Sequence, residues 1–190
     1  MSSGRGRARR APSTLGGMFD QLPHQPAAEH PELLGEPVRR LIHLLPDAEV
    51  FVIDPALSDT EALCRAYGED ESTCGNCVIV RGRRGETERT AACLALATTR
   101  VDVNRLVRRR LDVRKCSFAP MDDAVAESGM EYGAITPVGL PPEWPIWIDT
   151  AVARAERVCI GAGTRSAKLI VPGRSLSALP NAEIVDQLAH

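Results

Sequence analysis

Apolar and polar residues alternate along the chain with two periods, one typical of helices and one typical of strands. Helical spacing predicts helices over residues 32–45, 59–67, 103–110, 120–129 and 174–179. The first of these contains Pro37, which is expected to break it. The second begins in a capping box at residues 58–61 and ends at Gly68. We therefore expect short helices with their own start and stop signals.

Short runs rich in β-branched and other apolar residues predict strands between these helices. They cover residues 49–53, 77–81, 89–97, 115–118, 146–149, 157–161, 167–171 and 183–186. Turn-forming residues at 82–85 join the second and third runs into an expected hairpin. Because helices and strands mix without strict alternation, the sequence predicts an α+β fold with a mixed sheet.

Composition divides the chain into a tail and one domain. Residues 1–31 are rich in arginine, glycine and proline and carry little apolar surface, so we expect a disordered tail. Alternatively, its arginines form a basic arm that contacts RNA phosphates. Residues 32–190 are enough for a single folded domain. Because the formal net charge is −2, any basic surface must be local.

The sequence carries no signal for a membrane. No apolar run reaches the roughly 18 residues that a membrane span needs. The basic N-terminus lacks the apolar stretch of a secretory signal, so we expect a cytoplasmic protein whose six cysteines are thiols. Cys74 and Cys77 have the spacing of a redox dithiol. A structural zinc site would need a second pair of ligands, so no metal is expected.

Two glycine-rich segments are the clearest candidates for a binding site. The first runs from Gly129 to Leu140, and the second is the turn at residues 161–163. Glycine lets a backbone approach a ligand closely, and exposed amides can hold a carboxylate, a phosphate or a developing oxyanion. The alternatives are an irregular helix–strand connection for the first segment and a simple hairpin turn for the second.

Basic residues gather on the predicted helix over residues 103–110. Arg105, Arg108 and Arg109 share one face through their spacing of three and four residues. Such a face is either simply solvated or in contact with RNA phosphates.

The order of these elements resembles the YbaK / prolyl-tRNA synthetase-associated editing domain family. The matching stretches are residues 128–140, 147–149, 158–163 and 168–170, within a likeness that covers roughly residues 35–187. The resemblance implies a single domain around a mixed, barrel-like β-sheet with flanking helices. It also implies an aminoacyl-tRNA deacylase, which hydrolyses the ester of a wrongly attached amino acid. Its partners would be tRNA and an aminoacyl-tRNA synthetase, and no metal or organic cofactor would be needed.

The resemblance also assigns residues to the substrate pocket. One side would consist of Gly129, Gly133, Thr136, Pro137 and Gly139, and the other of Gly161, Ala162 and Gly163. The face formed by Arg105, Arg108 and Arg109 would contact the tRNA. Small amino acids such as Cys, Ala, Ser or Pro are the substrates that the family suggests.

One position departs from the family pattern. Family members usually carry a lysine at the start of the strand that begins here near residue 76, and this chain has Asn76 there. Asparagine can donate a hydrogen bond but supplies no positive charge, so it would stabilise an oxyanion less. Lys168, just after the second glycine-rich turn, would restore the charge if its side chain faces the pocket.

Three functions are compatible with these residues. In the leading one, water attacks the ester carbonyl while loop amides and Asn76 or Lys168 stabilise the oxyanion. In the alternative, a protein without the family lysine keeps the pocket and binds tRNA or an aminoacyl group without turning it over. In the third, Cys74 and Cys77 act as a thiol redox pair.

Overall fold

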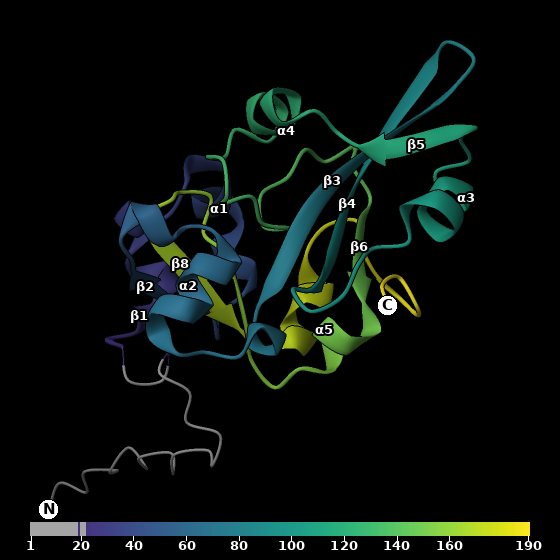
Figure 1. The fold of residues 1–190 in the computed structure, drawn as a ribbon. Coiled ribbons are helices and arrows are strands. Elements are labelled where there is room, and N and C mark those ends of the chain that lie inside the picture. The colour runs from purple at the N-terminus through teal and green to yellow at the C-terminus, as the bar shows by residue number, and fades with distance from the viewer. Residues whose placement is uncertain (1–18, 20–21) are drawn as a thin grey trace, which may run out of the picture.

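Two β-sheets form the centre of the protein, which is described here by a computed structural model covering Phe19 and residues 22–190 (Figure 1). The strands are β1 (Gln25–Pro26), β2 (Glu49–Val52), β3 (Gly75–Arg84), β4 (Thr87–Leu96), β5 (Lys115–Phe118), β6 (Ile146–Asp149), β7 (Val158–Gly161), β8 (Ala167–Val171) and β9 (Ala182–Val185). The α-helices are α1 (Glu36–Leu41), α2 (Thr60–Tyr67), α3 (Arg108–Arg110), α4 (Met121–Ser128) and α5 (Thr150–Arg154).

The strand order is β1-β2-β8-β7 in one sheet and β5-β3-β4-β6-β9 in the other. The first sheet is antiparallel, whereas β4, β6 and β9 of the second run parallel to one another. A parallel bridge between Cys74 and Cys159 joins the start of β3 to β7, so the sheets meet along one edge. The predicted α+β fold with a mixed, barrel-like sheet is confirmed, although the barrel is not closed.

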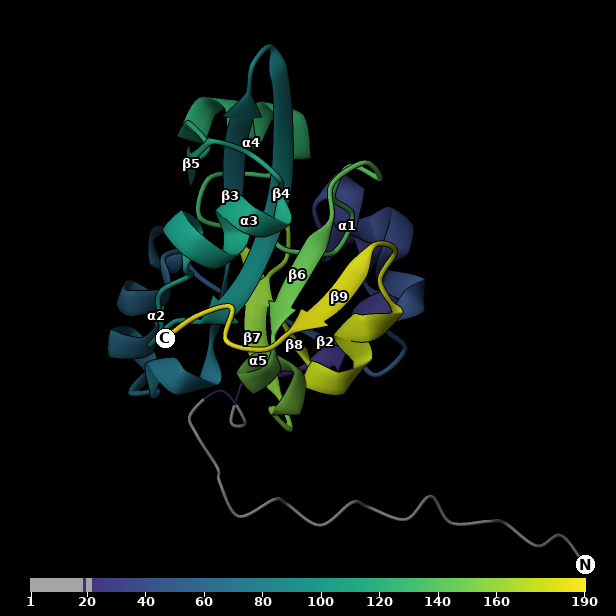
Figure 2. The ribbon, with the colours of Figure 1, turned by 90° about the vertical axis from the view of Figure 1, so that its right-hand side faces the viewer.

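The hairpin of β3 and β4 is the longest feature of the fold. Its ten-residue strands pair from Gly75 opposite Leu96 to Arg84 opposite Thr87. The far end of the hairpin projects from the body beside β5 and α3 (Figures 1 and 2). We call the far end of the hairpin, β5 and residues 103–114 the arm.

Apolar residues on the two faces of β3 belong to different core clusters. Ile79 lies in the main cluster between the sheets, whereas its neighbour Val80 lies in a second cluster under the arm. A third cluster packs Phe51 of β2 and Leu63 of α2 around Cys74 and Cys159. The alternation along β3 is that expected for a strand buried on both faces.

The helices follow the predicted pattern with four differences. The segment predicted as a helix over 32–45 divides into α1 and two flanking 3-10 turns, Pro31–Leu33 and Ile42–Leu44. The helix predicted over 103–110 begins as a π-helical turn, Val103–Val107, capped by Asp102. The segment predicted as a helix over 174–179 is a 3-10 helix, Gly173–Ala178. Helix α5 was not predicted from the pattern, because its five residues are too few to show a helical period.

The cap of α2 is a correction to the sequence analysis. The side chain of Asp59, rather than Ser58, accepts the amide hydrogen of Ala62 at 3.1 Å. Ser58 is the C-cap of the preceding 3-10 turn and is buried. The helix stop at Gly68 is confirmed, with the left-handed backbone conformation that favours glycine.

Residues before the expected domain boundary at residue 32 already pack on the domain. Strand β1 pairs with β2, and Ala27 is fully buried in the main cluster. Residues 1–18 and 20–21 of the predicted tail lie outside the described residues. Across the described part of the chain, no helix is long and apolar enough to cross a membrane.

Candidate functional site

The two glycine-rich segments pack directly against each other. The amide of Glu131 donates to the carbonyl of Gly163 at 3.1 Å, and the amide of Gly163 donates to the carbonyl of Ala134 at 3.0 Å. A side chain at Gly161 would place Cβ 2.4 Å from the carbonyl oxygen of Ala134. The structure therefore brings together the two segments that the sequence singled out, and it joins them backbone to backbone.

Several of these glycines allow close packing within the protein. Gly139 has a φ of +88°, and a Cβ there would lie 2.2 Å from the carbonyl oxygen of Pro37 in α1. A Cβ on Gly163 would lie 3.2 Å from Cα of Gly35, whose amide donates to the carbonyl of Ala162. Gly161, Ala162 and Gly163 are buried, so their part in the site is to hold the first segment in place.

Gly133 differs from the buried glycines at positions 161 and 163 because it is exposed. Within the described part of the chain, neither its amide nor that of Ile135 donates to a protein acceptor. The side chain of Ser58 lies next to Gly133, because a Cβ on Gly133 would be 3.0 Å from the hydroxyl oxygen of Ser58. Fixed, unpartnered amides on an ordered loop are suited to an anionic or developing oxyanionic atom.

Lys168 is buried behind this loop. Its side chain is 4% exposed, and Nζ donates to the carbonyl oxygen of Ser58 at 2.6 Å. Burial lowers the pKa of Lys168, and nearby Cys159, Cys74 and Asp59 partly oppose this effect. The side chain therefore does not face bulk solvent, and it ties residue 58, just before α2, to β8.

Asn76 is held by Thr60, the first residue of α2. The hydroxyl of Thr60 donates to Oδ1 of Asn76 at 2.7 Å, and Asn76 is exposed. With Oδ1 engaged, the amide nitrogen Nδ2 keeps its two hydrogens for a ligand. The next residue, Cys77, points to the opposite face of β3 and packs against the main cluster, which Ile135 also contacts.

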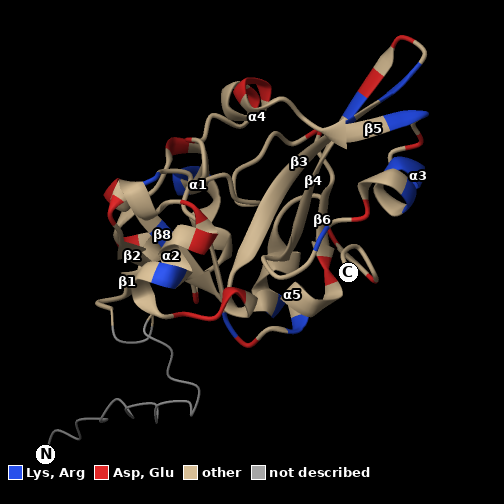
Figure 3. Ribbon diagram, in the orientation of Figure 1, with Lys and Arg blue, Asp and Glu red and all other residues tan. Residues whose placement is uncertain are grey.

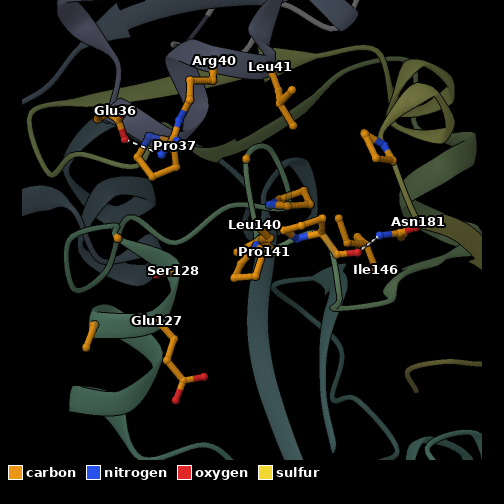
Figure 4. A pocket seen from close by; sticks show the side chains of 16 residues that line it. Glu36, Pro37, Arg40, Leu41, Glu127, Ser128, Leu140, Pro141, Ile146 and Asn181 are labelled. Atoms are coloured by element: carbon orange, nitrogen blue, oxygen red, sulfur yellow. Dashed lines mark hydrogen bonds and ion pairs between the residues drawn. The ribbon is translucent and has the colours of Figure 1, made fainter.

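The remaining predicted pocket residues lie apart from Gly133. Gly129, Pro137 and Gly139 line a cavity of about 500 Å³ together with Pro37, Arg40 and Asn181 (Figure 4). Five of its lining residues are prolines, which have no N–H to donate. Thr136 is fully buried, and its hydroxyl has no hydrogen-bond partner among the described residues.

The predicted tRNA-contacting arginines lie on the arm. Arg105, Arg108 and Arg109 are exposed, and no ion pair joins them to a described acidic side chain. The adjacent Arg110 instead pairs with Glu183 at 2.5 Å and lies over the ring of Trp147. Acidic and basic side chains mix along the rest of the arm (Figure 3).

The cysteines do not form the pair that the sequence spacing suggested. Cys74 lies 3.5 Å, sulfur to sulfur, from Cys64, and it belongs to the third cluster, whereas Cys77 packs against the main one. All six are free thiols. Burial raises the pKa of Cys64 and of Cys77 to about 12, which disfavours the reactive thiolate. Among the described residues, no three metal-ligating side chains come together.

Sequence reasoning missed three residues of the site. Ser58 and Thr60 were interpreted only as part of a capping box, although their side chains contact Gly133 and Asn76. Arg165 reaches the same loop and donates to the carbonyl of Tyr132 at 3.1 Å. These contacts join residues 16 or more positions apart, so local patterns carry no signal for them.

Comparison with known proteins places this fold and site in one class. A sequence profile of the aminoacyl-tRNA editing domain matches residues 54–179. That match spans most of the chain, and it includes both glycine-rich segments, Asn76 and Lys168. The protein therefore belongs to the aminoacyl-tRNA editing domain family, which confirms the resemblance stated from the sequence.

Solved structures share the fold at low sequence identity. A proposed trans-editing enzyme for prolyl-tRNA synthetase superposes with a TM-score of 0.66 at 18% identity, over 85% of this chain and 96% of that chain. A hypothetical protein superposes with a TM-score of 0.65 at 18% identity, over 74% of this chain and 90% of that chain. No curated protein sequence matched the chain.

Proposed function

We propose that this protein is an aminoacyl-tRNA deacylase that removes a mischarged small amino acid from tRNA. The observation that carries the proposal is the pair of unpartnered amides, Gly133 and Ile135, on a loop fixed beside Ser58. A developing oxyanion is the species that such preorganised donors stabilise most. Membership of the editing-domain family supports the same assignment.

In the proposed reaction, water attacks the carbonyl carbon of the ester between the amino acid and the terminal ribose. The carbonyl electron pair moves onto oxygen, where the Gly133 and Ile135 amides and Nδ2 of Asn76 donate hydrogen bonds. Collapse of this intermediate breaks the bond to the ribose oxygen, which takes up a proton. The products are the free amino acid and a tRNA with a free terminal hydroxyl.

The neighbouring ribose hydroxyl of the tRNA assists by orienting the water and carrying its proton. Asn76 and Thr60 cannot act as general bases near neutral pH. Lys168 does not touch the substrate in this scheme. It positions Ser58, and through Ser58 the loop at Gly133, while its charge lies behind the oxyanion.

The proposed substrate is a tRNA that carries a small amino acid such as Cys, Ala, Ser or Pro. The match to a proposed trans-editing enzyme for prolyl-tRNA synthetase supports a partnership with a synthetase, with this chain acting on its misacylated product. Arg105, Arg108 and Arg109 would contact the tRNA backbone, since they are exposed and free of ion pairs to described acidic side chains.

A second candidate function is binding without hydrolysis, in the cytoplasm as for the first. It is favoured by the absence of a charged side chain at position 76 and by the burial of Lys168. The site would then retain donors for an aminoacyl group but would stabilise the transition state too weakly for turnover.

The decisive experiment is release of labelled amino acid from a panel of mischarged tRNAs. Wild type would be compared with Lys168→Ala, Lys168→Met and Asn76→Lys, with Lys115→Ala as the matched control at the only other lysine. Deacylation by wild type, lost in both Lys168 variants but with kcat retained in Lys115→Ala, supports the enzyme. An inert wild type whose Asn76→Lys variant gains activity supports the binder.

A further inference from the structure

Tyr132 lies at the edge of the site and has an exposed ring. It is 57% exposed and directly precedes Gly133. The guanidinium of Arg165 lies over the ring, with its central carbon 5.9 Å from the ring centroid. An aromatic ring open to solvent beside a cation is suited to a flat, electron-rich group.

Contacts from three chain segments hold this pair in place. Arg165 donates from Nη1 to the carbonyl of Tyr132 at 3.1 Å and from Nη2 to the carbonyl of Pro55 at 2.9 Å. The backbone amide of Arg165 donates to the carboxylate of Glu131 at 2.5 Å, and the hydroxyl of Thr164 donates to the same oxygen at 3.3 Å. The segment carrying the ring is therefore ordered before any ligand arrives, which lowers the entropy lost on binding.

We propose that Tyr132 and Arg165 form a stacking platform for the terminal adenine base of tRNA. The inference rests on the proposed function, because it takes the ester to lie at Gly133. Tyr132 and Gly133 are consecutive, so one short segment would hold the base on its ring and the ester carbonyl on its amide. Stacking on an aromatic ring tolerates any base but favours the larger surface of a purine.

This platform explains two features that the hydrolytic site leaves unused. The exposed ring has no partner in the protein other than Arg165 among the described residues. Arg165 also lies close to Gly133, with Nη1 3.7 Å from the position of a Cβ there. Its charge would thus lie near both the base and the adjoining phosphate, which is the combination that single-stranded nucleic acid ends require.

The test is a binding cycle with deacylated acceptor-stem RNA hairpins that end in CCA, in CCU or in CC. Wild type is expected to bind the CCA end best. Tyr132→Ala should lower affinity for the CCA end roughly tenfold, which is within the range for loss of one stacked base. Tyr132→Phe, the matched control, keeps the ring and should keep the affinity. For the CC end, wild type and Tyr132→Ala should bind alike.

An equal loss for the CCA and CC ends would overturn the platform and indicate a contact elsewhere on the RNA. No loss with any RNA would overturn it too and would leave the ring as a protein-contact residue. The cycle uses uncharged RNA, so it is independent of hydrolysis. If no amino acid is released but the loss of affinity in Tyr132→Ala is specific to the CCA end, the deacylase proposal is wrong and the platform is supported. If amino acid is released but Tyr132→Ala shows no such loss, the platform is wrong and the deacylase proposal is supported.

Discussion

The two glycine-rich segments and the arm are held in place by different kinds of contact. In the first, residues 129–139 and 161–168 are fixed by backbone contacts so close that a single added methyl group would collide. In the arm, charged side chains meet in ion pairs near the surface, such as Arg83 with Glu86 at 3.1 Å and Arg89 with Asp112 at 3.2 Å. Acidic and basic residues lie close together along this region (Figure 3). The first arrangement fixes backbone positions by close packing, and the second leaves charged side chains near the solvent.

The largest expected effect comes from adding a methyl group where the two glycine-rich segments pack together. Gly161→Ala would place Cβ 2.4 Å from the carbonyl oxygen of Ala134, and neither backbone can move without breaking the contact between segments. We expect a loss of about 3 kcal/mol in the free energy of unfolding, the upper end for overpacking. Urea denaturation followed by circular dichroism would measure it.

The arm supplies the matched control. Gly85 at the hairpin turn has a φ of +60°, and a Cβ there would meet nothing within 4 Å. Gly85→Ala should therefore show only backbone strain, about 1 kcal/mol. Equal losses for the two variants would mean that the glycine-rich segments adapt to an added methyl group as easily as the arm does, and they would contradict the proposed difference between the two regions.

The contrast also shows what the sequence could and could not predict. Strands, the hairpin and the stop at Gly68 follow from local patterns, and they were predicted correctly. A sequence shows that Gly133 and Gly161 are both glycines, but not that one exposes its amide while the other packs on Ala134. That distinction depends on pairing between segments nearly thirty residues apart.

Side-chain roles in the site were hidden for the same reason. Ser58 was interpreted as a helix cap because capping signals are local, yet its carbonyl is the partner of Lys168, 110 residues away. The burial of Lys168 was likewise unexpected, since lysine is mostly exposed. The family resemblance singled out two loops that the structure packs against each other, and tertiary contacts determine which of their amides have no partner in the described part of the chain.

The second expected effect concerns the orientation of Asn76 at the start of β3. Thr60→Val removes the hydroxyl that engages Oδ1, so the amide would rotate and present Nδ2 less often. We expect kcat for deacylation to fall roughly fivefold with little change in KM, within the range for losing one hydrogen bond. Thr60→Ser keeps the hydroxyl and should restore kcat, whereas a Thr60→Ser variant as slow as Thr60→Val would refute the orienting role.

A smaller effect is expected on the arm. Arg105→Ala, Arg108→Ala and Arg109→Ala should each weaken tRNA binding by a modest factor that is similar for different tRNAs. Removal of one arginine from a phosphate should reduce the slope of log affinity against log salt by about 0.7 to 0.9. Titrations of tRNA at several salt concentrations would measure the slope. Arg174→Ala, an exposed arginine of the 3-10 helix Gly173–Ala178 outside the arm, should leave it unchanged.

The smallest expected effect is on the pH dependence of stability, and it compares the thiol of Cys64 in α2 with the thiol of Cys116 in the arm. Burial, and secondarily the neighbouring Cys74, raises the pKa of Cys64, on the buried side of α2, from 9.0 to about 12. Below pH 9 both the folded and unfolded chains keep this proton, so its contribution to stability is fully present. Above pH 9 the unfolded chain loses the proton first, and the contribution declines as the pH rises towards about 12.

Urea midpoints measured from pH 7 to pH 10.5 should therefore fall less steeply for Cys64→Ala than for wild type. Cys116 in the arm is the control, because its half-exposed thiol has a raised pKa that arises mainly from burial and is opposed by the charge of Arg108. Cys116→Ala should flatten the decline less than Cys64→Ala does. If the two variants follow the same curve, the thiol of Cys64 in the third cluster is no better shielded from water than the thiol of Cys116 on the edge strand of the arm.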